Sequence, residues 1–123
     1  IEEKEVLVLG DGEQMRSFTY IDDVVQALLL MMDYKGSNTF NIGSNITVSL
    51  NEVIKTIEEY SGKKANIKNE ERAYKDPDVV RPNLENISNE LNWKPSTNIE
   101  VGIEKTVSWY LENKEFLNDI VYI

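Results

Sequence analysis

The side chains that this chain lacks limit the chemistry it can perform. It contains no cysteine and no histidine, so a thiolate nucleophile, a Ser-His-Asp arrangement and an imidazole general base are all excluded. A disulfide scaffold and a zinc site of the usual kind are excluded for the same reason. Any chemistry within these residues must therefore use carboxylates, lysine, arginine or tyrosine.

Adjacent carboxylates occur at Asp22-Asp23, Glu58-Glu59 and Glu70-Glu71. Neighbours in sequence point apart on helices and strands, so adjacency does not make an acid–base pair, and no EF-hand spacing accompanies them. Tyr20 and Lys75 offer an acid and a base, but nothing in their spacing places them together. Helix capping and solvated faces explain the carboxylates better, and we predict no catalytic residue and no metal site.

The arginines are more informative, because the sequence has only three of them, at positions 16, 72 and 81. A guanidinium binds two phosphate oxygens at once, which a lysine cannot do. Arg16 lies beside an expected turn and Arg81 lies beside Pro82, so a local pair could grip a diphosphate. Ion pairing with the many carboxylates of this acidic chain is the alternative explanation, and both stay open at this point.

Two glycines, Gly10 and Gly12, follow a short apolar run, as in loops that bind phosphate. However, no third glycine opens a helix after them, and no Lys-Ser or Lys-Thr pair follows as in a P-loop. A plain turn is therefore the simpler explanation.

The composition is that of one folded globular domain, which we expect to cover residues 1–123. Of these residues 41% are hydrophobic and 28% are charged, and the net charge is −9. The acidic balance argues against nucleic acid and anionic lipid as partners. The longest apolar run, residues 24–32, is too short to span a membrane. We expect no membrane partner and a cytoplasmic location.

Hydrophobic spacing and turn residues predict short strands that alternate with short helices. The expected strands cover residues 6–9, 18–21, 39–43 and 64–68. The expected helices cover residues 22–33, 50–61, 84–91 and 99–112. The fold class is therefore α/β or α+β.

Local features add detail to these elements. Asp22 or Asp23 is expected to cap the helix at 22–33, whose apolar residues cover most of its circumference and are expected to lie in the core. Ser49 and Glu52 fit a capping box at the start of the next helix. Trp93 is expected to pack against the core.

Residues 10–25 resemble the motif G-D-G-x-Q-x-R-x-F-x-Y-V-x-D-V of nucleotide-sugar epimerases, dehydratases and decarboxylases, the extended short-chain dehydrogenase/reductases. Three further matches follow in the order of that family. They are residues 40–43 (Phe-Asn-Ile-Gly), Asp76-Pro77 with Arg81-Pro82, and residues 91–95 (Leu-Asn-Trp-Lys-Pro), which are similar to L-G-W-x-P. Together the four motifs cover nearly the whole chain.

The resemblance is confined to the C-terminal third of such enzymes. Their N-terminal Rossmann half carries a glycine-rich NAD(P) fingerprint and a Tyr-x-x-x-Lys catalytic pair. This sequence lacks the fingerprint, and its two Tyr-x-x-x-Lys spacings, at Tyr60–Lys64 and Tyr110–Lys114, lie in the part that resembles the C-terminal third. The chain also starts with Ile1 and not with methionine. We therefore expect residues 1–123 to be the substrate-binding lobe of a longer enzyme, a small α/β lobe of short strands and about four helices that lacks the Rossmann half.

The resemblance also implies partners and a site. The implied ligand is a nucleotide-diphosphate sugar, and the implied partner is the N-terminal Rossmann domain of the same protein. NAD(P) would bind in that domain, with no cofactor in this chain. The parent enzyme would be a homodimer. Arg16 matches the arginine that contacts the nucleotide diphosphate, and Leu7, Val8 and Leu9 match the segment beside the base. Arg81 is roughly placed for a second phosphate contact.

Two functions follow from these expectations. The favoured one is nucleotide-sugar binding in a parent isomerase or lyase, where hydride would pass from the hexose to NAD+ and return after epimerisation, elimination or decarboxylation. The lobe alone is not expected to be catalytic. The alternative is a non-catalytic acidic interaction module on the same scaffold, with Trp93, Trp109 and Tyr110 as an exposed apolar surface.

Overall fold

The computed structural model describes residues 5–73 and 77–115, so the expectations for Lys75 and Asp76 fall outside the described residues. Within this part the elements follow in the order β1 (Glu5–Leu9), β2 (Met15–Arg16), α1 (Ile21–Asp33), β3 (Val48–Ser49), α2 (Leu50–Ser61), β4 (Asn66–Glu70), β5 (Val79–Val80), α3 (Glu85–Leu91) and α4 (Ile99–Glu112). The predicted mixture of short strands and four helices is confirmed for the described residues.

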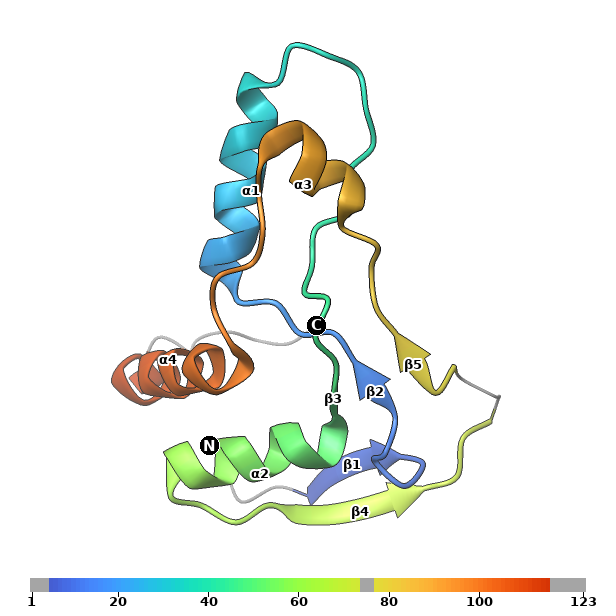
Figure 1. The fold of residues 1–123 in the computed structure, drawn as a ribbon. Coiled ribbons are helices and arrows are strands. Elements are labelled where there is room, and N and C mark those ends of the chain that lie inside the picture. Colours follow the sequence, from blue (N-terminus) through green and yellow to red (C-terminus); the bar gives the residue numbers. More distant parts are fainter. Residues whose placement is uncertain (1–4, 74–76, 116–123) are drawn as a thin grey trace.

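The strands form two small sheets (Figure 1). β1 and β4 are parallel, with Glu5 opposite Asn66 and Leu9 opposite Glu70. In the second sheet β2 lies between β3, to which it is antiparallel, and β5, to which it is parallel. The strand that carries Arg16 is therefore held from both sides.

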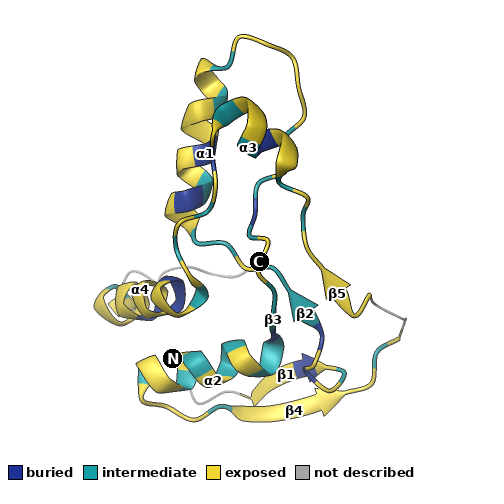
Figure 2. Cartoon of the chain, in the orientation of Figure 1, coloured by how far each residue is buried: buried dark blue, intermediate teal, exposed yellow. Residues whose placement is uncertain are grey.

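The main core lies between α1, α3 and the segments that flank them. Ala27, Ile87 and Trp93 form its buried cluster. Half-buried side chains pack against this cluster, namely Phe40, Ile42, Leu84 and Leu91. Trp93 is only 3% exposed, which confirms that it packs against the core and removes it from any exposed surface with Trp109 and Tyr110. Figure 2 shows how few residues are fully buried.

Two helices, α2 and α4, have the bounds that the sequence predicts. The capping box of α2 is confirmed as well. Ser49 Oγ accepts a hydrogen bond from the Glu52 amide at 3.1 Å, and the Glu52 carboxylate accepts one from the Ser49 amide at 2.8 Å. These bonds satisfy backbone donors that have no partner within the helix, which is why the helix begins at this point.

Two of the predicted strands are wrong. β2 ends at Arg16 and α1 begins at Ile21, so no strand covers residues 18–21. Residues 39–43 alternate in burial as a strand would, but within the described residues no neighbouring strand pairs with them. A strand needs hydrogen-bonding partners for its backbone, and alternating side chains do not supply them. The strand expected at 64–68 is present two residues later, as β4.

The start of α1 also differs from the prediction, because neither Asp22 nor Asp23 caps it. The N-cap is Tyr20, which makes no side-chain capping bond. Asp23 is buried and accepts hydrogen bonds from Ser96 Oγ at 2.8 Å and from the Thr97 amide at 3.0 Å. Burial raises the pKa of the Asp23 carboxyl, but these hydrogen bonds outweigh burial and hold its pKa below the ordinary value. The carboxylate thus ties α1 to the segment that leads into α4.

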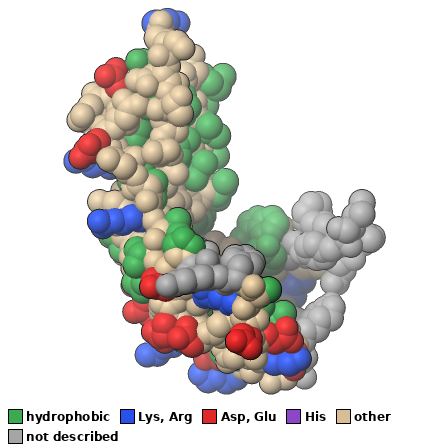
Figure 3. Space-filling model, turned by 90° about the vertical axis from the view of Figure 1, so that its right-hand side faces the viewer, with side chains coloured by type: hydrophobic (Ala, Val, Ile, Leu, Met, Phe, Trp, Pro, Cys, Tyr) green, Lys and Arg blue, Asp and Glu red, His purple; other side chains and the backbone are tan. Residues whose placement is uncertain are grey.

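The expectation that α1 is central to the core is only partly met. Its buried residues are Asp23 and Ala27. Most of its large apolar side chains are exposed, namely Ile21, Val25, Leu28, Leu29, Leu30 and Met32. In the space-filling view of Figure 3, hydrophobic side chains run along one edge of the upper part of the molecule, while charged side chains gather on the lower part. The helix therefore covers the core with one face only.

We predict that Asp23→Asn lowers the free energy of unfolding at pH 7 by about 1.5–3 kcal/mol, the contribution of hydrogen bonds to a charged group. Because the pKa of Asp23 is lowered in the folded protein, this contribution is complete above the ordinary carboxyl pKa and is lost as the pH falls through the lowered value. Urea unfolding of the wild type and the variant between pH 7 and acid measures both effects.

The matched control is Asp22→Asn, which removes the same charge from the exposed neighbouring position. It is expected to change the free energy of unfolding by no more than about 0.5 kcal/mol. Equal losses in the two variants would mean that the hydrogen bonds of Asp23 contribute nothing specific.

Candidate functional site

A pocket lies where β1 and β4 end, and it gathers most of the predicted site. Its volume is about 460 Å³, and it is lined by Leu7, Val8, Leu9, Gln14, Arg16, Leu50, Glu71, Arg72 and Ala73. Four of the five predicted site residues, Leu7, Val8, Leu9 and Arg16, thus line one pocket. Leu7 and Leu9 are exposed while Val8 is buried, as alternation along a strand requires. We name this the arginine pocket.

The chain leaves β1 through a turn in which two glycines have left-handed backbone geometry. Gly10 has φ 85° and Gly12 has φ 81°, in the left-handed region that side chains disfavour. A Cβ on Gly10 would lie 2.8 Å from Nε of Arg72, and a Cβ on Gly12 would collide with the amide of Asn51. The chain's own side chains therefore fill the space over both glycines, which agrees with a plain turn and not with a phosphate loop.

Hydrogen bonds from three side chains fix the backbone of this turn. Arg72 Nε and Gln14 Nε2 both donate to the carbonyl of Leu9, at 2.9 and 3.1 Å. Asn69 Nδ2 donates to the carbonyl of Gly10 at 2.7 Å. Gln14 is 9% exposed, and its Oε1 has no hydrogen-bond partner within the described residues. Two of these three side chains, Arg72 and Gln14, thus hold the turn and also line the pocket.

Arg16 projects from β2 into the same pocket. Its Nη1 donates to the carbonyl of Met15 at 2.8 Å and to that of Pro77 at 3.1 Å. These bonds hold the guanidinium on a strand that has a neighbour on each side. Arg16 and Arg72 thus place two guanidinium groups around one pocket in a chain whose net charge is −9.

The structure does not bring Arg81 to this pocket. Arg81 follows β5 and lines a separate depression of about 590 Å³ together with Lys94 and Asn45. Arg72 lines the arginine pocket together with Arg16 instead. Sequence reasoning counted Arg72 but gave it no role, because its place depends on the parallel pairing of β1 with β4. The only signal in the sequence was that Arg72 closely follows the expected strand at 64–68.

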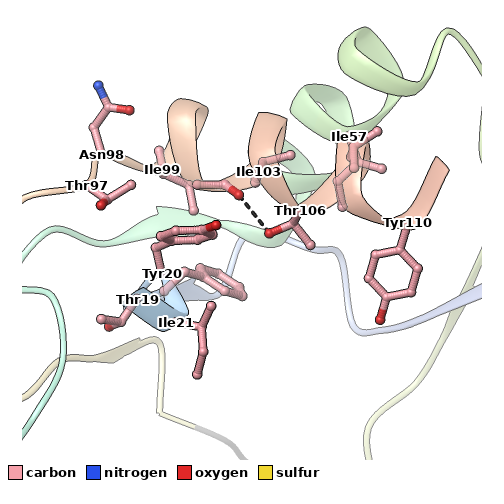
Figure 4. Close-up of a pocket in the computed structure, with 13 residues that line it drawn as sticks. Thr19, Tyr20, Ile21, Ile57, Thr97, Asn98, Ile99, Ile103, Thr106 and Tyr110 are labelled. Carbon is pink, nitrogen blue, oxygen red and sulfur yellow. Dashed lines mark hydrogen bonds between the residues drawn. The ribbon is translucent and has the colours of Figure 1, made fainter. Parts of the chain in front are cut away.

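A second hollow of about 580 Å³ lies between residues 18–21 and α4 (Figure 4). We name it the α4 groove. Its lining is Phe18, Thr19, Tyr20, Ile21, Ile57, Thr97, Asn98, Ile99, Gly102, Ile103, Thr106, Val107 and Tyr110, none of which is charged. Thr106 Oγ1 already donates to the carbonyl of Gly102 at 2.7 Å. The α4 groove therefore suits an apolar surface, and the arginine pocket suits an anion.

Residues 5–73 and 77–115 were also searched for a metal site, for a Tyr20–Lys75 acid–base pair and for a membrane-spanning helix. That part of the chain contains no group of three or more carboxylates that could hold a metal ion. Tyr20 has Lys105 Nζ 5.0 Å from the centre of its ring, and Lys75 lies outside the described residues. None of the described helices is both long and apolar enough to cross a membrane.

Comparison with known proteins identifies the family. The model of the GDP-mannose 4,6-dehydratase family matches residues 1–106. The chain belongs to this family. UDP-glucuronate 4-epimerase of Thermodesulfobacterium geofontis is 34% identical over 120 residues, which are 97% of this chain and 37% of that protein. This family membership confirms the resemblance to NAD-dependent nucleotide-sugar epimerases and dehydratases.

Solved structures agree with the sequence comparison. MoeE5 in complex with UDP-glucuronic acid and NAD has a TM-score of 0.83 at 28% identity, over 89% of this chain and 38% of that one. UDP-glucose 4-epimerase of Thermotoga maritima with UDP-glucose has a TM-score of 0.79 at 31% identity, over 91% and 36%. The chain thus has the fold of one part of these enzymes and spans little more than a third of their length.

We predict that Gly10→Ala is more destabilising than Gly62→Ala. Both glycines have positive φ, but a Cβ on Gly62 has nothing within 4 Å, whereas one on Gly10 meets the guanidinium of Arg72. Gly62→Ala is expected to cost about 1–2 kcal/mol for left-handed geometry alone. Gly10→Ala is expected to cost more than this, because the new Cβ must also displace the side chain of Arg72.

Chemical denaturation of both variants measures the difference in their free energies of unfolding. Equal losses would show that Arg72 can move away from the turn at no cost.

Proposed function

We propose that this chain binds the nucleotide diphosphate of a sugar nucleotide within an NAD-dependent epimerase, dehydratase or decarboxylase. The observation that carries this proposal is the arginine pocket, which Arg16 and Arg72 both line in an acidic chain. Guanidinium groups keep their charge at any working pH and match phosphate oxygens with paired donors. The exposed Leu7 and Leu9 offer an apolar wall to the base.

The described residues do not fit NAD itself. A dinucleotide-binding turn needs glycines over which the pyrophosphate can pass and a helix that begins directly behind them. Here Arg72 and Asn51 occupy the space over Gly10 and Gly12, and the next element is a strand, β2. In the proposal NAD(P) therefore binds to an N-terminal Rossmann domain of the longer protein, and this chain supplies no catalytic residue.

The role of this lobe is positioning. Binding energy from a nucleotide that does not react can hold the sugar in place for chemistry elsewhere. The proposal extends to a cytoplasmic, homodimeric parent enzyme that acts as an isomerase or a lyase. The alternative, an acidic interaction module, is weakened because Trp93 is buried in the core and only Trp109 and Tyr110 of its suggested surface are exposed.

We predict that Arg16→Ala weakens UDP binding to the full-length protein by about 10-fold to 150-fold, the equivalent of about 1.5–3 kcal/mol. Arg16→Lys keeps the charge but loses the paired donors, so a smaller loss is expected. Lys55→Ala, which removes one positive charge from the exposed face of α2, is the matched control and should leave affinity unchanged. Isothermal titration calorimetry measures all three.

The same titration shows whether Arg72 and Arg81 contribute to UDP binding. Arg72→Lys is expected to weaken UDP binding, because Arg72 lines the pocket. Arg81 stays a prediction from the family resemblance, and Arg81→Ala tests it directly. Unchanged affinity in Arg16→Ala would leave Arg16 as a structural residue and remove the centre of the proposed site.

We also predict that the 123-residue chain alone neither binds NAD tightly nor converts any nucleotide sugar. It has no histidine and no glycine-rich NAD(P) fingerprint, and side chains of the chain itself fill the space over its glycine turn. Fluorescence titration with NADH and an assay of product formation test both statements. Measurable NAD-dependent conversion by the pure chain would contradict the assignment of catalysis to another domain.

A further inference from the structure

The depression that Arg81 lines is separate from the arginine pocket. Its volume is about 590 Å³, and its lining comes from Asn45, from the segment between β5 and α3, from α3 itself and from Lys94 and Pro95. Figure 1 shows the chain rising from β5 into α3. The depression shares no lining residue with the arginine pocket. We name it the Arg81 depression.

The register of the strands explains why Arg81 and Arg16 line different hollows. β2 and β5 are parallel, and Arg16 lies opposite Val80. Side chains in register project from the same face of a sheet, and the next residue along a strand projects from the other face. Arg81 directly follows Val80, so this alternation directs it away from Arg16. The two arginines accordingly belong to two sites.

Two positive charges line the Arg81 depression without a partner in the part of the chain that the structure describes. Within residues 5–73 and 77–115, Arg81 and Lys94 make no ion pair and no side-chain hydrogen bond. By contrast, Lys64 Nζ lies 2.6 Å from a carboxylate oxygen of Glu58. The lining also contains the carboxylate of Glu85, which leaves one positive charge in excess. In a chain with 22 acidic and 13 basic side chains, such a hollow favours an anion.

Uncharged polar side chains complete the lining. Those of Asn45, Ser88 and Asn89 make no hydrogen bond within the described residues. An amide and a hydroxyl each offer both a donor and an acceptor, which is what the hydroxyl groups of a sugar require. The volume also lies within the range of about 300–1,000 Å³ that small-molecule pockets have. The lining therefore suits an anion that carries hydroxyl groups better than a bare inorganic anion.

Contacts between distant segments hold the walls of the depression in place. Pro82 packs so closely on Gly43 that a Cβ on this glycine would lie 2.6 Å from Cγ of the proline. Asn41 Nδ2 donates to the carbonyl of Asn83 at 3.1 Å. Helix α3 is anchored by Ile87, which is fully buried. The depression is thus formed by the fold itself, which lowers the cost of ordering the site when a ligand binds.

We propose that the Arg81 depression binds a small polyhydroxy anion, a sugar phosphate or a sugar acid, at a site separate from that of the nucleotide diphosphate. Arg81 and Lys94 hold the phosphate or carboxylate group, and Asn45, Ser88 and Asn89 bind the hydroxyl groups. The inference goes beyond the proposed function, because it gives Arg81 a different anion from the one that the family resemblance implies.

The test uses the full-length protein saturated with UDP, so that the arginine pocket is occupied. Isothermal titration calorimetry with glucose 6-phosphate, with glucuronate and with inorganic phosphate distinguishes a phosphate ligand from a carboxylate ligand. At least one of the two sugar anions is expected to bind about tenfold more tightly than inorganic phosphate, because its hydroxyl groups add hydrogen bonds. Equal affinities would overturn the proposal, and so would no binding of either sugar anion at millimolar concentrations.

Two variants locate the bound sugar anion. Arg81→Ala and Lys94→Gln are each expected to weaken its binding about tenfold or more, since each removes a charged donor. Both side chains are exposed, so neither substitution disturbs the core. Lys55→Ala, which removes a positive charge from the exposed face of α2, is the matched control and should change nothing. Binding that neither variant weakens would overturn the proposal.

A third variant separates the hydroxyl groups from the charge. Asn89→Ala removes an exposed amide but no charge, so it is expected to reduce the preference for the sugar anion over inorganic phosphate. An unchanged preference would overturn the assignment of the hydroxyl groups to this lining.

The binding of UDP is measured with the same protein preparations. Lys94→Gln is expected to leave UDP affinity unchanged, because Lys94 does not line the arginine pocket. A parallel loss of UDP and sugar-anion binding in this variant would overturn the assignment of a separate site. A failure of this inference therefore appears in the sugar-anion titrations, whereas a failure of the proposed function appears in the Arg16 titration.

Discussion

The left-handed turn after β1 is the constraint on which the candidate site depends. Gly10 and Gly12 allow the backbone to reverse where a side chain would collide with Arg72 or Asn51. The carbonyl of Leu9 then accepts hydrogen bonds from Arg72 and from Gln14. The turn therefore sets the path of the chain into β2, and so the place of Arg16, and it also anchors Arg72 beside the pocket.

Helix boundaries were predictable where the signal is local. The start of α2 follows from a reciprocal bond between Ser49 and Glu52, and that of α4 from Asn98, whose side chain accepts from the Val101 amide at 2.9 Å. Both capping interactions join residues within one turn of the helix. Strands were less predictable, because their existence depends on a partner elsewhere in the chain. Residues 39–43 have the side-chain pattern of a strand but no such partner among the described residues.

The same distinction applies to the candidate site. Arg16 and residues 7–9 lie close in sequence to the turn that joins them, so a motif could identify them together. Arg72 comes from the other end of a parallel pairing between β1 and β4, which no spacing within a motif records. Asp23 is a similar case, since its partners Ser96 and Thr97 lie more than seventy positions away.

Hydrophobic periodicity shows that a face is buried but not what buries it. In α1 the pattern predicted a core helix, and the structure gives it a small cluster with Ile87 and Trp93 on one side and exposed side chains on the other. The pattern identifies which side chains of α1 are apolar, but the core that some of them join depends on contacts with α3 and with the segment around Trp93, which lie more than fifty positions away in the sequence.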